Sequence, residues 1–161
     1  MAEEEGSNSK KKVMVAIDES ECSYYALEWA LKNLHESLVN SEVIVFTAQP
    51  IADYSYLYAS SMGMAPPELI KTFQEQHQKL AEALLAKAKD ICNKHGITAQ
   101  TVTEVGDPKE IICQAVEKFK VEMLVMGTHG RGALQRAFLG SVSNFCVHNA
   151  KCPVLVVRKT D

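Results

Sequence analysis

The chain has 161 residues, of which 47% are hydrophobic and 23% are charged, and its formal net charge is −3. This length and balance are typical of one soluble globular domain with a substantial core. Lysine and arginine form no basic stripe, so a nucleic-acid partner is not expected. The apolar runs are too short to span a bilayer, and residues 1–12 lack the apolar segment of a secretory signal, so no membrane association is expected.

Cysteine and histidine usage argues against metal and disulfide chemistry. The five cysteines are odd in number, contain no Cys-x-x-Cys pair and fall mostly within apolar patterns. We therefore expect buried thiols in a reducing compartment, and hence a cytoplasmic protein. The five histidines are scattered and form no His-x-x-x-His pair, so no resident metal site is expected.

The N-terminal residues differ in composition from the rest of the chain. Residues 3–5 are three consecutive acids, residues 6–9 are small and polar, and residues 10–12 are three consecutive lysines. Such a segment buries too little apolar surface to offset the entropy of ordering it. We expect a disordered tail over residues 1–10 and a single domain over residues 11–161.

The first half of that domain alternates strand and helix patterns. Residues 13–17 are a short apolar run, typical of a buried parallel strand. Ser20 is placed to cap the following helix, whose apolar face continues to Leu38. Residues 42–48 are β-branched and aromatic and are predicted as the second strand. Residues 50–67 contain prolines and tyrosines and are predicted as a long functional or mobile loop.

The second half continues the alternation to a fifth strand. Apolar residues at helical spacing predict a helix over residues 67–94, and Gly96 provides its stop. Asp107 is predicted as the N-cap of another helix, with Pro108 at its first position and Glu110 at its third. The remaining predicted elements are a strand over 97–105, a strand over 123–126, a helix over 141–149 and a strand over 154–157.

Five strands separated by four helices predict an α/β fold, an open five-stranded parallel sheet with helices on both faces. In such folds ligands bind at the carboxyl ends of the strands, where the strand order reverses. Asp18, Ala48 and Gly127 all lie at such ends. If the first and fourth strands are neighbours, these three residues converge on one crevice.

A glycine-rich run joins the fourth strand to the last helix. It reads Gly-Thr-His-Gly-Arg-Gly over residues 127–132 and Gly-Ser-Val-Ser over residues 140–143. Glycines let backbone N–H groups approach a ligand, and a helix N-terminus adds unpaired donors and a positive dipole end. The run is neither Gly-x-Gly-x-x-Gly nor a Walker loop, because no lysine stands between Gly140 and Ser141. It nevertheless suits a phosphate and indicates a nucleotide-binding protein.

At these residues the chain resembles the universal stress protein family. The resemblance extends from Lys11 to Lys159, and it looks most like the small single-domain plant members. The spacing Gly-x2-Gly-x9-Gly-Ser is that of the ATP-binding branch. The resemblance implies a Rossmann-like, adenine nucleotide alpha-hydrolase-like fold with strand order 3-2-1-4-5. It is carried by residues 15–20 (Val-Ala-Ile-Asp-Glu-Ser), 126–132 (Met-Gly-Thr-His-Gly-Arg-Gly), 139–143 (Leu-Gly-Ser-Val-Ser) and 152–157 (Cys-Pro-Val-Leu-Val-Val).

The same resemblance implies a site for ATP or AMP. The glycines would line the phosphate path, and residues 141–143 would hold phosphate through backbone N–H and hydroxyl groups. Ala16 and Asp18 would border adenine and ribose, and Ala48 would meet the adenine edge through its backbone. Asp18 is also the residue that would approach Mg²⁺ carried by the nucleotide. The expected binding residues are Ala16, Asp18, Ala48, Met126, Gly127, Gly130, Arg131, Gly132, Gly140, Ser141, Val142 and Ser143.

Several of these residues have a second interpretation. Asp18 is either a ligand contact or only a turn and cap residue. Ser141 is expected at the N-cap in either case, and its one hydroxyl serves as the cap or as a phosphate donor. Arg131 either neutralises phosphate charge or points to solvent. His129 is either a turn residue beside the ligand or a general acid/base.

The expected function is that of an adenine-nucleotide-binding regulatory protein of the stress response, with unknown protein partners. No catalytic residue is expected, and at most weak ATP hydrolysis. One alternative is a slow ATPase or nucleotidyl-transfer enzyme that uses Asp18, Arg131 and His129. Another is a dimeric chaperone-like interaction protein. The resemblance implies an antiparallel homodimer through the last strand, residues 154–157.

Overall fold

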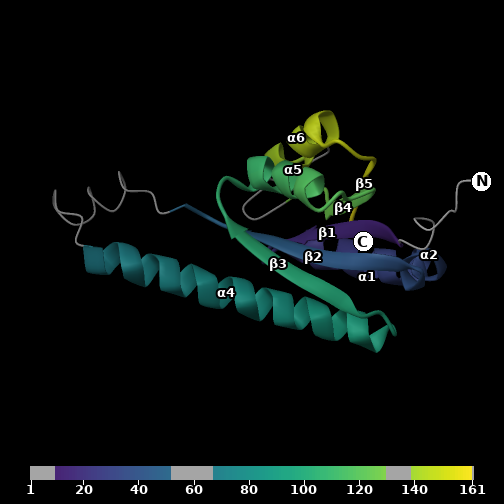
Figure 1. Cartoon of the computed structure of the whole chain (residues 1–161), viewed down its shortest axis with the longest axis horizontal. Coiled ribbons are helices and arrows are strands. Elements are labelled where there is room, and N and C mark those ends of the chain that lie inside the picture. The colour runs from purple at the N-terminus through teal and green to yellow at the C-terminus, as the bar shows by residue number, and fades with distance from the viewer. Residues whose placement is uncertain (1–9, 52–66, 130–138, 161) are drawn as a thin grey trace, which may run out of the picture.

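The computed structural model describes residues 10–51, 67–129 and 139–160, and these residues form an α/β fold (Figure 1). Some expectations fall outside the described residues. They are most of the N-terminal tail, most of the 50–67 loop, and the binding residues Gly130, Arg131 and Gly132.

The centre of the molecule is a five-stranded sheet in which every neighbouring pair of strands is parallel. The strand order is β3-β2-β1-β4-β5, which confirms the expected fold class and order. The strands are β1 (Lys11–Ile17), β2 (Ser41–Gln49), β3 (Ala99–Val105), β4 (Met123–Gly127) and β5 (Val154–Val157).

Helices cover both faces of this sheet (Figure 1). On one face lie α1 (Glu21–Asn33), α2 (His35–Val39) and α4 (Pro67–Lys94), and on the other lie α5 (Pro108–Lys118) and α6 (Ser141–Asn149). Alternate residues of β1 face the two layers: Val13, Val15 and Ile17 pack in the first core, and Met14 and Ala16 pack in the second. The apolar run of a strand buried on both faces follows from this arrangement.

Helix ends differ from the sequence expectations at two places. The single helix expected through Leu38 is wrong, because Leu34 has φ −116° and ψ 23° and divides it into α1 and α2. Leu38 is buried all the same, at 1% exposure. The N-cap expected at Asp107 and the proline expected at the first position of the next helix are confirmed. The Asp107 side chain, however, makes no cap hydrogen bond, and its carboxylate lies 3.8 Å from the Lys109 ammonium.

The glycine stop after α4 is confirmed. Gly96 has φ +74°, and the N–H of Ile97 donates to the Cys92 carbonyl oxygen at 3.0 Å. This bond satisfies a carbonyl that the helix end would otherwise leave unpaired. Because this turn extends through Ile97, the third strand begins at Ala99, two residues later than expected.

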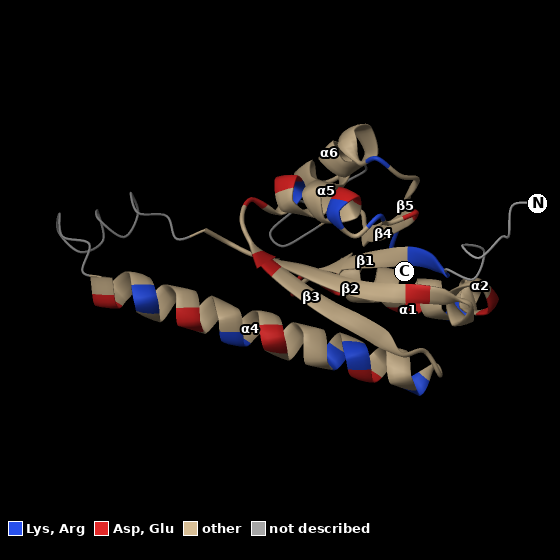
Figure 2. Cartoon of the chain, viewed as in Figure 1, with Lys and Arg blue, Asp and Glu red and all other residues tan. Residues whose placement is uncertain are grey.

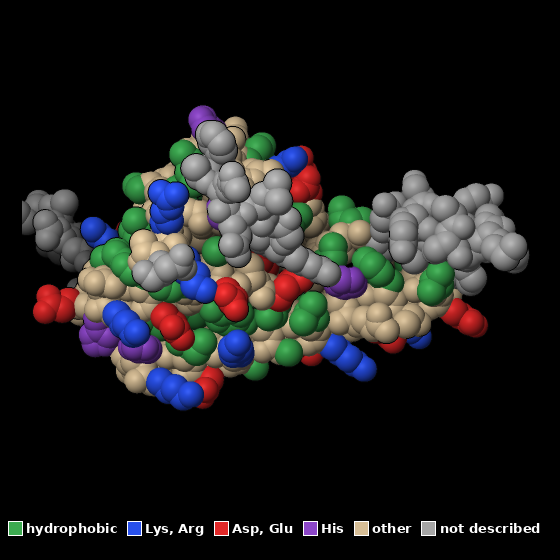
Figure 3. Space-filling model, turned by 180° about the vertical axis from the view of Figure 1, so that it is seen from behind, with side chains coloured by type: hydrophobic (Ala, Val, Ile, Leu, Met, Phe, Trp, Pro, Cys, Tyr) green, Lys and Arg blue, Asp and Glu red, His purple; other side chains and the backbone are tan. Residues whose placement is uncertain are grey.

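The charged surface carries both signs. Figure 2 shows acidic and basic residues alternating along α4, and Figure 3 shows them interspersed on the opposite side of the molecule. Two ion pairs at i,i+4 spacing, Lys71–Glu75 and Asp90–Lys94, belong to the pattern on α4. None of the helices in the described part of the chain is long and apolar enough to cross a membrane.

Candidate functional site

The turn between β1 and α1 is held by a network of short side chains. The Asp18 carboxylate accepts from the N–H of Ser20 at 2.8 Å, and the Ser20 hydroxyl accepts from the N–H of Ser23 at 3.2 Å. Ser20 is therefore the N-cap of α1, as predicted. The Ser23 hydroxyl accepts from the N–H of Asp18 at 3.1 Å and lies 2.9 Å from the Asp18 carbonyl oxygen, to which it donates. Asp18 is thus a turn residue at the carboxyl end of the central strand.

A second network joins the end of β4 to the start of α6. The Thr128 carbonyl oxygen accepts from the N–H of Gly140 at 2.7 Å and from the Ser143 hydroxyl at 2.7 Å. These bonds fix the first turn of α6 beside the end of β4. The dipole and the N-terminal donors of α6 are consequently held at the carboxyl edge of the sheet.

The N-cap of α6 is Gly140, so the expectation that Ser141 caps this helix is wrong. The first intrahelical bond runs from the N–H of Asn144 to the Gly140 carbonyl oxygen at 2.9 Å. Ser141, Val142 and Ser143 therefore occupy the first three helical positions, whose N–H groups have no acceptor one turn earlier in a helix. These are the groups that the sequence analysis assigned to phosphate.

The Ser143 hydroxyl is used within the protein. Its side chain is 2% exposed and lies 2.7 Å from the Thr128 carbonyl oxygen and 3.1 Å from the Gly140 carbonyl oxygen. A hydroxyl has one proton to donate, and here it goes to a carbonyl oxygen. The expectation that this hydroxyl is available to a phosphate is therefore not supported by its contacts.

A cavity of about 510 Å³ lies at this edge of the sheet. Residues that end β1, β2 and β4 line it together with the first residues of α5 and α6. The volume is in the range of small-molecule sites in proteins. All nine of the predicted binding residues that the structure describes line it, namely Ala16, Asp18, Ala48, Met126, Gly127, Gly140, Ser141, Val142 and Ser143.

Five further lining residues are absent from that predicted set: Ile17, Ser23, Pro108, Ile112 and His129. Ser23 could have been predicted from the sequence, because it lies three residues after the N-cap Ser20, in the first turn of the helix that follows an apolar strand. Ile112 lies on the apolar side of α5, and a helical repeat does not distinguish a cavity wall from a core contact.

The ionisable side chains that line the cavity, among the described residues, are Asp18 and His129. The His129 Nδ1 atom is buried and has no hydrogen-bond partner within the described structure. The His129 carbonyl oxygen lies 3.5 Å from the Ser20 hydroxyl, which places the chain after β4 beside the turn after β1. No group of three or more metal-ligating side chains occurs among the described residues.

The sequence profile of the universal stress protein family matches residues 10–158. The chain belongs to the universal stress protein family. A universal stress protein A-like protein of Arabidopsis thaliana is 29% identical, with 92% of this chain and 90% of the relative covered. A universal stress protein of Methanocaldococcus jannaschii is 32% identical over 96% of this chain and 85% of its own length.

One related protein has been solved with a nucleotide bound. It is a universal stress protein family protein from Arabidopsis thaliana with AMP bound. It superposes on this chain with a TM-score of 0.66 at 25% identity, covering 93% of this chain and 92% of its own. The relatives come from a plant and from an archaeon, so the family match does not assign the chain to a plant-type subgroup.

Proposed function

We propose that this universal stress protein binds an adenine nucleotide, ATP or AMP, in the cavity at the carboxyl edge of the sheet. The observation that supports this most is that nine of the predicted residues line one cavity, together with the first turn of α6. The AMP held by the related Arabidopsis protein supports the same ligand class.

The start of α6 suits a phosphate group. The N–H groups of residues 141–143 stand at the positive end of the helix dipole, and such helix starts bind anions without a basic side chain. We assign the glycine spacing to the ATP-binding branch, in which Gly130, Arg131 and Gly132 would complete the phosphate contacts.

The rest of the cavity suits a nucleoside. Ala16, Ala48 and Met126 supply apolar surface from three adjacent strands, which fits the flat face of a purine. In this proposal Asp18 accepts a ribose hydroxyl and is also the residue nearest to any Mg²⁺ that the nucleotide carries.

We propose binding and regulation of the stress response in preference to catalysis. Phosphoryl transfer requires groups that neutralise charge and orient the attacking nucleophile. Among the described lining residues only Asp18 and His129 are ionisable, and they offer neither a carboxylate pair nor a lysine. Occupancy of the cavity would instead bias the conformation that partner proteins recognise.

We also propose that the protein forms a homodimer through β5. This strand is an edge of the described sheet, paired with β4 on one side only, and such an edge presents backbone groups to a second chain.

We further propose a reducing, cytoplasmic setting for the protein. It fits the state of the cysteines, because all five are free thiols.

Calorimetry on nucleotide-free protein tests the proposed ligand. We expect saturable binding of ATP and AMP and much weaker binding of GTP. Gly140→Asp places a negative charge at the helix start and should abolish binding by repelling phosphate, whereas Gly140→Ala adds no charge and should weaken binding much less. The alanine is a fair control because Gly140 has φ −63° and ψ 163°, a conformation open to any residue. Absence of ATP and AMP binding at millimolar concentration would overturn the proposal.

A further inference from the structure

Three cysteines gather behind the cavity wall, between the sheet and the two helices on its second face. Cys113 lies on α5, Cys146 on α6, and Cys152 just before β5; all three belong to the second core or pack against it. We call these residues the thiol cluster. Cys146 is fully buried, and the sulfur atoms of Cys113 and Cys146 are 3.9 Å apart.

We propose that Cys113 and Cys146 are a redox pair that hydrogen peroxide converts to a disulfide, which joins α5 to α6. A disulfide requires two sulfur atoms about 2.05 Å apart, so the pair must close by roughly 2 Å. The two residues already face each other from directly packed helices. Rotation about the side-chain torsions together with a small helix shift supplies the remaining approach.

The reaction is a two-electron oxidation with balanced products. The Cys113 sulfur, the more exposed of the two, attacks one peroxide oxygen and becomes a sulfenic acid while water leaves. The Cys146 sulfur then attacks the Cys113 sulfur, its proton passes to the departing hydroxyl, and a second water leaves. Two thiols and one peroxide thus yield one disulfide and two waters.

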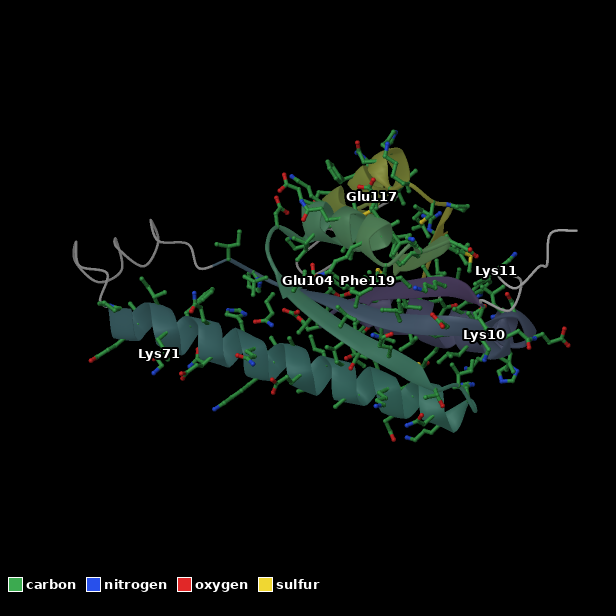
Figure 4. The ribbon with its side chains drawn as sticks, in the orientation of Figure 1. Lys10, Lys11, Lys71, Glu104, Glu117 and Phe119 are labelled. Atoms are coloured by element: carbon green, nitrogen blue, oxygen red, sulfur yellow. The ribbon has the colours of Figure 1, made fainter. Side chains whose placement is uncertain are left out.

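The surroundings of the pair determine how fast it reacts. Burial raises the pKa of the Cys113 thiol, the contact with the Cys146 sulfur partly offsets this rise, and the charge of Glu117, one helical turn later on α5 (Figure 4), adds to it. Burial raises the pKa of Cys146 to about 12. The thiolate is the nucleophile, so the raised pKa of Cys113 slows the first step and the raised pKa of Cys146 slows the second. The disulfide carries no charge, so burial does not oppose the product, and the pair responds to sustained rather than brief peroxide exposure.

The location of the pair connects it to the cavity. Ile112 precedes Cys113, and Ser143 lies one helical turn before Cys146; both residues line the cavity. A disulfide between Cys113 and Cys146 would pull the two helices closer together, and this would move the first turn of α6 relative to α5. We expect oxidation to lower nucleotide affinity, a consequence that rests on the proposed function.

Peptide mapping of the peroxide-treated full chain under non-reducing conditions tests the disulfide directly. The expected product is a Cys113–Cys146 linkage that a dithiol reductant reverses. Cys113→Ser and Cys146→Ala should each prevent it, and Cys22→Ser, outside the thiol cluster, should leave it unchanged. A main product that links Cys152 or two chains, or no disulfide after prolonged treatment with excess peroxide, would overturn the proposal.

Calorimetry on the mapped samples tests the effect on the cavity. Oxidised protein should bind ATP about 5-fold or more weakly than reduced protein, with no such difference in Cys113→Ser. Equal affinities in the two redox states would overturn the regulatory consequence. Reduced protein that binds no nucleotide would instead overturn the proposed function, while the peptide map would still decide whether the redox pair exists.

Discussion

A Cβ atom on Gly127 would lie 2.7 Å from the carbonyl oxygen of Cys22. The last residue of β4 therefore packs directly on the backbone of the first turn of α1. This glycine was predicted to give phosphate access, and the close packing against Cys22 is a second, structural reason for a glycine here. The close approach brings the turn after β1 beside the residues that follow β4, and the cavity lies where they meet.

Gly127→Ala should therefore destabilise the fold. The contact is with backbone atoms, which cannot rotate away, so the sheet and α1 must separate, and we expect a loss of about 1–3 kcal/mol in the free energy of unfolding. Denaturant unfolding of the wild type and of Gly127→Ala measures this loss as a lower midpoint for the variant. An unchanged midpoint for Gly127→Ala would contradict the close packing.

Changes at Asp18 separate its turn role from its ligand role. Asp18→Asn keeps an oxygen that accepts from the N–H of Ser20, so thermal stability should be retained, whereas Asp18→Ala loses that bond. We expect Asp18→Ala to lower ATP affinity about 10-fold, as for loss of one hydrogen bond to a charged group, and Asp18→Asn to lower it less. Calorimetry with and without Mg²⁺ measures both. If Asp18→Ala binds ATP with wild-type affinity, Asp18 has no ligand role and stabilises only the turn.

Much of the fold follows from local sequence signals. The helix over residues 141–149 and the strand over residues 154–157 are found within the predicted bounds, because the glycines before the helix and Pro153 after it punctuate the chain. The break at Leu34 was not predictable in the same way. Leu34 continues the apolar repeat, and only the tertiary packing of α2 shows that the chain leaves the helix there.

The candidate site was predictable where its residues follow strands. Strand ends converge by the geometry of a parallel sheet, so the order β1–β4 was enough to bring Asp18 and Gly127 together. The place of Ile112 in the cavity wall was not predictable, because it depends on how α5 packs over the sheet. The Cys113–Cys146 contact depends on the packing of two helices that are separate in sequence, and no spacing rule reports it.

Alkaline pH should destabilise the protein through its buried thiols. Burial raises the pKa of Cys92 to about 11 and of Cys146 to about 12, from 9.0 in an accessible thiol. Below pH 9 both the folded and the unfolded states hold these protons. At higher pH only the unfolded state releases them, so stability falls until the folded pKa is reached, by up to about 1.4 kcal/mol per pH unit for each thiol.

Urea unfolding measured at several pH values from 8 upward checks this dependence. The Cys146→Ala variant is the control, because lysines and tyrosines that titrate in the same range are common to both proteins. Its stability should fall less steeply than that of the wild type above pH 9. Parallel pH profiles for the two proteins would show that the Cys146 thiol does not contribute.

Val156→Lys should weaken the proposed homodimer. Val156 pairs with Met126 within the sheet and lies on β5, the edge strand assigned to the dimer contact. A lysine there places a charge at the centre of a strand that a second copy would cover, and charged residues on edge strands oppose pairing between sheets. Multi-angle light scattering should show a dimer for the wild type and mainly monomer for Val156→Lys.

The opposite edge of the same sheet supplies the matched control. Gln100 is exposed on β3, so Gln100→Lys adds the same charge to an edge strand that has no assigned partner chain. It should remain dimeric. Circular dichroism must first show that both variants are folded, because Val156 also packs against the second core. If a folded Val156→Lys protein keeps the wild-type dimer mass, the dimer contact does not lie along β5, because the added charge meets no second chain there. A monomeric wild type would contradict the proposed homodimer itself.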